Sequence, residues 1–118
     1  MNTIRQTQSS MLADPENKWI YMMDFVDDFR YYKDVSAIEG SISTGKDAEL
    51  DALLASSVEY LCDELDIDPP EWTSNISACK DPYFVHGMEN LKAISVVESP
   101  LRFRIRKIFV LENFLSRA

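Results

Sequence analysis

This sequence of 118 residues contains very little cysteine, histidine or glycine. Its two cysteines, Cys62 and Cys79, and its single histidine, His86, are too few for a disulfide framework or a Cys/His zinc site. We expect both thiols to be reduced, small core residues. One histidine with no nucleophile motif beside it makes no catalytic triad, so a structural or exposed role is expected for His86.

Long hydrophobic runs are missing as well. No segment approaches the ~20 apolar residues that span a bilayer, and the first ten residues lack the charged and apolar regions of a signal peptide. We therefore expect a cytoplasmic protein with no membrane partner. The composition, 46% hydrophobic and 27% charged, is typical of a folded globular protein and not of a disordered chain.

The length of the chain fits one domain of ordinary size better than two. Residues 1–13 are polar with scattered apolar positions, so we predict a flexible N-terminal arm there, with a short helix as the alternative. Residues 14–118 are predicted to form a single helical domain. The expected fold class is mainly α, a compact single-domain helical bundle with at most a short strand near residues 108–110.

Two long amphipathic helices are predicted in the first two thirds of the chain. The first starts at Asp14, which we expect to cap it, and runs to about Tyr32. The second follows a capping box formed by Thr44 and Asp47, and ends before Asp68, because Pro69 disfavours helical geometry in the residue that precedes it. Apolar residues at spacings of three and four define the two stripes: Trp19, Met22, Met23, Val26 and Phe29, then Leu50, Leu54, Val58, Leu61 and Leu65.

The last third is less regular. Asp81-Pro82 repeats the pattern of a cap followed by proline, and Leu91, Ile94 and Val97 have helical spacing within residues 88–98. Residues 101–107 alternate basic and apolar side chains after a proline, which suits either a strand or a short helix. Residues 111–117 are expected to form a final helical turn or two.

Charge is distributed unevenly along the chain. Residues 1–100 carry seven basic and nineteen acidic groups, net −12, whereas residues 101–118 carry five basic groups and one acidic group, net +4. A body this acidic repels a phosphate backbone, so general nucleic-acid binding is disfavoured.

Acidic clusters on the two long helices are the best candidate for catalysis. Each of the two helices carries a trio of carboxylate side chains. If the two trios face each other, they could hold Mg²⁺ next to a nucleotide phosphate, which would make the chain a small magnesium-dependent, nucleotide-processing helical enzyme. The simpler interpretation places both trios on solvated helix faces, and no cofactor is then expected. The proposed ligands are Asp24, Asp27, Glu59, Asp63 and Asp66, with Asp28 beside them.

The basic stretch also has two interpretations. If the segment is extended, Arg102, Arg104 and Arg106 project on one side as guanidinium forks for a partner's carboxylates or phosphates. If it is helical, Arg102 and Arg106 lie one turn apart and Arg104 points away. The alternative to a partner role is intramolecular pairing with the acidic helices, which would fasten the C-terminal segment to the domain.

Several stretches together resemble a family of small bacterial helical domains that often follow a helix-turn-helix module. They are WIYMMDFVDDF, DIDPPEW, DPYF, ESPLRFRIRKIFV and the closing LSRA, in the same order over about residues 18–118. The resemblance implies an antitoxin-like partner of a nucleotidyltransferase-like toxin, encoded beside it. The eighteen residues before Trp19 are too few for a helix-turn-helix module.

The expected function is therefore a non-catalytic protein–protein interaction module that binds and neutralises a toxin-type enzyme. A third alternative, beside the magnesium enzyme, is a phage or mobile-element protein with an unknown target. Buried aromatic anchors supply affinity at such interfaces, and charge sets encounter rate and discrimination. The candidate partner-binding residues are Trp72, Tyr83, Phe84, Arg102, Phe103, Arg104, Arg106 and Lys107.

Overall fold

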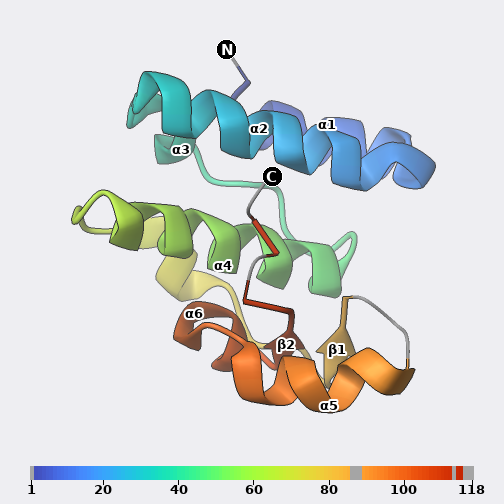
Figure 1. The fold of residues 1–118 in the computed structure, drawn as a ribbon. Helices are drawn as coiled ribbons and strands as arrows, with labels where there is room; N and C mark the ends of the chain where they lie inside the picture. The colour runs from blue at the N-terminus through green and yellow to red at the C-terminus, as the bar shows by residue number, and fades with distance from the viewer. Residues whose placement is uncertain (1, 86–88, 113, 116–118) are drawn as a thin grey trace. The chain divides into compact units, whose positions relative to one another are not determined.

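The structure, a computed structural model, describes residues 2–85, 89–112 and 114–115 (Figure 1). Within these ranges it contains six α-helices, two 3₁₀-helices and one two-stranded sheet, so the predicted mainly α class is confirmed. The chain divides into two compact units, the first ending at Ser43 and the second beginning at Thr44.

The first unit is built on a pair of helices that lie side by side (Figure 1). Its elements are α1 (Ile4–Ala13), η1 (Pro15–Asn17), α2 (Lys18–Tyr32) and α3 (Ser36–Glu39). A capping box starts α1, in which the Thr3 hydroxyl accepts from the Gln6 amide at 3.2 Å and the Gln6 side chain accepts from the Thr3 amide at 3.1 Å. The segment predicted as a flexible arm is therefore helical, because its first turn satisfies its own free amides.

The predicted helix ending at Tyr32 is confirmed as α2, with a different start and a shifted buried face. Its buried residues include Phe25, which the predicted stripe omitted, whereas Trp19 and Met23 are only half-buried. Asp14 does not cap the helix. Its carboxylate instead accepts from the Asn17 amide group at 2.9 Å and from the Tyr21 hydroxyl at 2.8 Å, and these bonds lower the pKa of Asp14.

The second unit contains the remaining helices and the sheet. Its elements are α4 (Ala48–Glu64), η2 (Glu71–Asn75), β1 (Tyr83–Phe84), α5 (Glu89–Glu98), α6 (Leu101–Arg104) and β2 (Ile108–Phe109). The predicted second helix is confirmed as α4, but Asp47 is its N-cap, accepting from the Leu50 amide at 3.1 Å, and Thr44 is not. After α4 the chain turns at Asp66, whose φ is 56°, and the Ile67 amide donates to the Cys62 carbonyl at 3.0 Å.

The strand predicted near residues 108–110 is present as β2. It pairs in parallel with β1, with Tyr83 opposite Ile108 and Phe84 opposite Phe109, and the two strands lie between α4 and α5 in Figure 1. Asp81-Pro82 leads into β1 and not into a helix. The prediction failed there because a two-residue strand is defined by its distant partner and shows no periodicity of its own.

Residues 101–106 adopt the helical alternative. Helix α6 continues through a turn in which the Ile105 amide donates to the Leu101 carbonyl at 3.0 Å, and Lys107, with φ at 61°, redirects the chain into β2. After β2 the described residues form a turn in which the Phe114 amide donates to the Leu111 carbonyl at 3.0 Å. Residues 113 and 116–118, part of the predicted final helix, lie outside the described residues.

Candidate protein-binding surface

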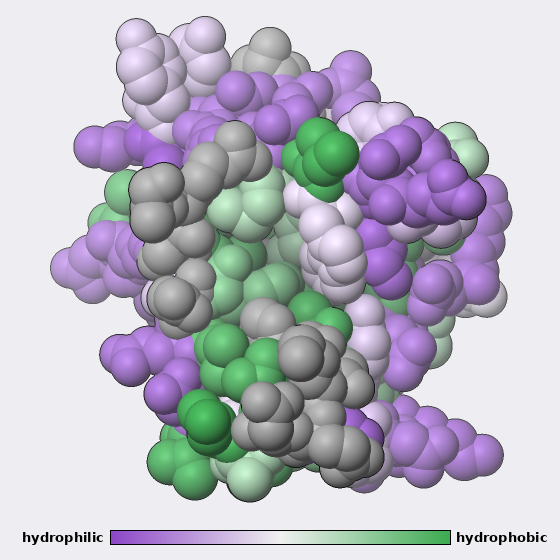
Figure 2. Space-filling view, turned by 45° about the vertical axis from the view of Figure 1, so that its right-hand side comes forward, coloured by the Kyte–Doolittle hydropathy of each residue, from purple (hydrophilic) through white to green (hydrophobic). Residues whose placement is uncertain are grey.

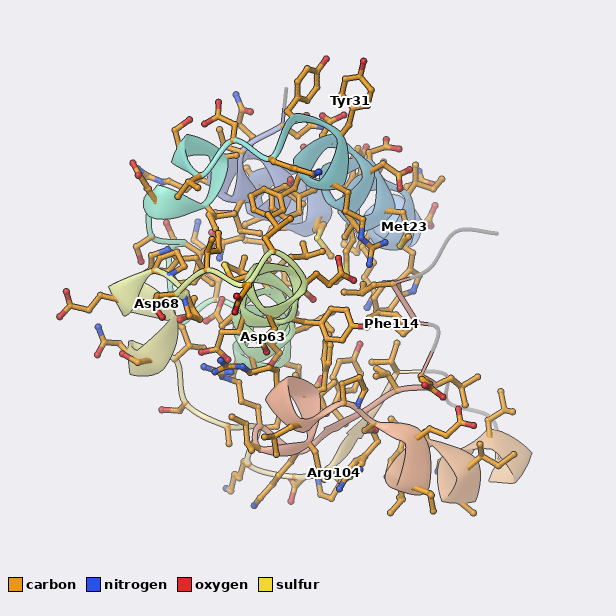
Figure 3. All side chains as sticks on the ribbon, turned by 60° about the vertical axis from the view of Figure 1, so that its left-hand side comes forward. Met23, Tyr31, Asp63, Asp68, Arg104 and Phe114 are labelled. Atoms are coloured by element: carbon orange, nitrogen blue, oxygen red, sulfur yellow. The ribbon has the colours of Figure 1, made fainter. Side chains whose placement is uncertain are left out.

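The helical turn at residues 101–106 sorts its side chains onto two faces. Positions 102, 103 and 106 lie on one face of such a turn, and positions 101, 104 and 105 lie on the other. The first face points toward α4. In Figure 3, Asp63 of α4 lies on one side of α6, and Arg104 lies on the opposite side, away from α4.

Arg106 lies inside the second unit, with a relative exposure of 5%. Its guanidinium forms a bidentate pair with Glu59 of α4, in which Nη1 donates to Oε1 and Nη2 donates to Oε2 at 3.2 Å. It also donates to the carbonyls of Thr73 at 2.7 Å and Ile76 at 3.3 Å, and to the Ser56 hydroxyl at 3.4 Å. This one side chain therefore connects α4, η2 and the segment that leads into β2.

Arg102 forms the outer part of the same network. Its Nε donates to Oδ2 of Asp63 at 2.9 Å and its Nη2 donates to Oδ1 at 3.0 Å, while Nη1 lies 4.0 Å from Oε1 of Glu59. The hydrogen bonds to Asp63 raise the pKa of Arg102. Intramolecular pairing, one of the two interpretations of the basic stretch, thus holds for Arg102 and Arg106.

The acidic clusters do not form a metal site in the part of the chain that the structure describes, where no group of three or more His, Cys, Asp or Glu could hold a metal ion. Glu59 and Asp63 are engaged with arginines. Asp24, Asp27 and Asp28 belong to α2 in the first unit, and the Asp28 carboxylate accepts from the Asn2 amide at 3.0 Å. Asp66 is exposed at the end of α4.

Arg104 and Lys107 face outward and are exposed. Nη2 of Arg104 donates to the carbonyls of Val97 at 3.2 Å and Ser99 at 2.9 Å, and Nζ of Lys107 lies 3.4 Å from the Lys80 carbonyl. Among the described residues, neither of these two cations has a carboxylate partner. Their positive charges are therefore available to an external group.

Large apolar side chains are also exposed on α5, on α6 and in the turn that follows α6. We define the α5–α6 apolar surface by five of them: Ile94, Val96, Val97, Leu101 and Ile105. Val97 is 76% exposed and Leu101 is 69% exposed. Figure 2 shows hydrophobic residues gathered at its lower left, at the height of α5 and α6 in Figure 1.

Helix α5 explains how this surface arises. Its predicted apolar stripe is present at helical spacing, but Ile94 and Val97 point to solvent, whereas Ser95 is only 2% exposed. Ser95 faces inward at the end of the helix, where its carbonyl accepts from the Ser99 hydroxyl. The helix thus turns β-branched apolar side chains outward, the reverse of an ordinary amphipathic surface helix.

The aromatic candidates from the sequence lie mainly in the core. Phe103 is fully buried and Trp72 is buried. Phe103 contacts Tyr60 at a ring distance of 5.9 Å, and Phe84 of β1 stacks on Phe109 of β2 at 5.1 Å. Tyr83 and Phe84 are half-buried, so none of the four projects freely as an anchor for a partner.

Both cysteines are free and buried, as expected for core residues. Burial raises the pKa of the Cys62 thiol to about 11, and it raises the pKa of Cys79 as well. A buried thiol with a raised pKa is less nucleophilic than an exposed cysteine. His86 lies outside the described residues.

Sequence reasoning named Arg104 and Lys107 but missed the apolar component beside them. The alternation within residues 101–107 includes Leu101 and Ile105 but does not show which face they occupy, and the spacing of Leu91, Ile94 and Val97 predicts a helix without showing which side of it is exposed. No local signal marks this component, because only the structure shows that α5 buries Ser95 and exposes Ile94, Val96 and Val97 around it.

No helix in the described part of the chain combines the length and the apolar character that a membrane span requires. Comparisons of the chain with protein-family models, with curated proteins and with solved structures give no match.

Proposed function

We propose that this chain is a non-catalytic protein–protein interaction module that binds and neutralises a partner enzyme, in the manner of an antitoxin. The observation that carries the proposal is the α5–α6 apolar surface, where five large apolar side chains are exposed within residues 94–105. Single exposed apolar residues are ordinary on a monomer, but a concentration of them is typical of a surface that another protein covers.

The surrounding charge supports the same role. The two exposed cations beside the apolar side chains, Arg104 and Lys107, hydrogen-bond to backbone carbonyls and leave their charge for a partner. Elsewhere the chain is strongly acidic, with a formal net charge of −8 overall. Such a contrast favours rapid and selective encounter with one partner over others.

The family resemblance supplies the proposed class of partner, a nucleotidyltransferase-like toxin encoded by a neighbouring gene. The magnesium enzyme is less well supported, because Glu59 and Asp63 are engaged in ion pairs with arginines. Mg²⁺ would have to break these pairs to gain its carboxylate ligands.

Co-expression with the product of the adjacent gene tests the proposal. We expect the two proteins to purify as a stable complex, and we expect this chain to restore growth to cells that the partner alone inhibits. A partner that inhibits growth equally with and without this chain, while the chain remains free in size-exclusion chromatography, would contradict the proposed function.

A further inference from the structure

The exposed face of α5 and α6 has the geometry of a helix-packing surface. Leu101 and Ile105 lie one turn apart, as the hydrogen bond between their backbones at 3.0 Å requires, and Ile94 and Val97 lie three residues apart on α5. Side chains at these spacings form ridges that fit the grooves of another helix. A helical segment therefore fits this surface better than an extended strand, which would need a free sheet edge.

Arg104 places a positive charge at the junction between α5 and α6, next to Val97. Its guanidinium is fixed by the carbonyls of Val97 and Ser99, at the junction between α5 and α6, so its position is set before any partner binds. Lys107 follows three residues later at the turn into β2. A group with fixed geometry loses less conformational entropy when it pairs with a ligand.

The charge also argues against a second copy of this chain as the occupant. A symmetric dimer through this face would bring the same surface patch of each copy together, including Arg104 and Lys107 on both sides. Like charges at an interface disfavour association. A partner that carries carboxylates at the edge of its apolar face would instead neutralise both cations.

Building on the interaction role proposed above, we propose that the α5–α6 apolar surface binds an amphipathic helix of the partner protein whose apolar face is bordered by carboxylates. Val97 and Leu101 are the central contacts, because they are the most exposed apolar side chains of the surface. Arg104 selects the acidic border through charge-assisted hydrogen bonds.

Two synthetic peptides of about 18 residues, longer than the ~12–15 below which isolated helices are marginal, test this recognition directly. Both carry leucine at helical spacing, and they differ only in having glutamate or lysine at the border positions. We expect the glutamate peptide to bind the full chain at least about tenfold more tightly at low salt, measured by fluorescence anisotropy. The advantage should shrink as ionic strength rises.

Variants then assign the binding to this surface. Val97→Ser with Leu101→Ser should abolish binding of the glutamate peptide, whereas Ile20→Ser, at a 57% exposed position of α2, should leave it unchanged. Arg104→Glu should remove the preference for glutamate over lysine. Lys46→Glu, the same charge change at another exposed position of the second unit, should preserve that preference. Circular dichroism confirms that each variant keeps its helix content.

Three results would overturn the inference: equal affinity for the two peptides, no binding of either, or a dimer of the chain that Leu101→Ser dissociates. Failure here and failure of the proposed function are separable. If the neighbouring enzyme is bound and neutralised equally well by the Val97→Ser, Leu101→Ser variant, the function stands and this surface is not its site. If the glutamate peptide binds but the enzyme is not neutralised, the surface stands and the function does not.

Discussion

Arg106 and Arg104 stand two positions apart in one short basic segment and have opposite surroundings. Arg106 is buried and makes five hydrogen bonds to groups of the same unit, one pair of them to the carboxylate of Glu59. Arg104 is exposed, and its side chain donates hydrogen bonds to the backbone carbonyls of Val97 and Ser99. The inward face of the segment holds the unit together, and the outward face carries the proposed binding surface.

The contrast shows that a cluster of basic residues in a sequence need not act as one patch. A helical turn sends residues i and i+4 to one side and residue i+2 to the other. Cations that the core does not use, such as Arg104, remain available for a partner. The residues to alter in a binding experiment are therefore those on the outward face.

The largest predicted effect concerns the inward face. Arg106→Leu removes the bidentate partner of the buried Glu59 carboxylate and leaves only Arg102, 4.0 Å away, so we expect the free energy of unfolding to fall by about 3–5 kcal/mol in urea titrations. Arg104→Leu on the outward face should change it by no more than about 0.5 kcal/mol. The double variant Glu59→Leu with Arg106→Leu should recover part of the loss, because no buried charge remains unpaired. Equal losses for the two arginine variants would contradict the division into faces.

A smaller effect is expected at the junction of α5 and α6. The buried hydroxyl of Ser99 accepts from the Val110 amide at 2.9 Å, joining the junction to the end of β2. Ser99→Ala leaves that amide without its acceptor, which should cost about 1–3 kcal/mol of stability and accelerate hydrogen exchange at Val110. Ser74→Ala serves as the control, since its hydroxyl bonds the Glu71 carbonyl at an exposed site. Unchanged exchange at Val110 would refute the proposed connection.

The smallest effect on stability is expected for the partly exposed ion pair between Arg102 and Asp63. The side chains of Arg102 and Asp63 are 32% and 48% exposed, so their ion pair is screened by water in spite of its bidentate geometry. Arg102→Ala should therefore cost only about 0–1 kcal/mol, and less at high salt. A loss as large as that of Arg106→Leu would mean that Arg102 shares the energetic role of the buried pair.

The long helices were the part of the fold that could be predicted from the sequence. The stripes that define α2 and α4 are local patterns, since one face of each helix is buried and repeats every three to four residues. The capping positions were less predictable. Asp14 bonds Asn17 and Tyr21, and Asp47 replaces Thr44 as the cap, because a short polar side chain has several partners within reach.

The candidate surface could be predicted only in part. The charge excess of residues 101–118 identified the region, and the helical alternative correctly separated Arg104 from Arg102 and Arg106. The outward direction of Ile94 and Val97 could not be predicted, because an apolar stripe is ordinarily the buried side of a helix.

By itself, the sequence determined the mainly α class, the extents of α2 and α4 to within a few residues, and the acidic character interrupted by one basic segment. These properties depend on composition and on local periodicity, which need no knowledge of distant contacts. The tertiary structure alone decided that Glu59 neutralises Arg106, that Tyr83 and Phe84 pair with Ile108 and Phe109, and which face of α5 is exposed. Each of these depends on residues far apart in the chain, whose proximity is set by packing and not by local pattern.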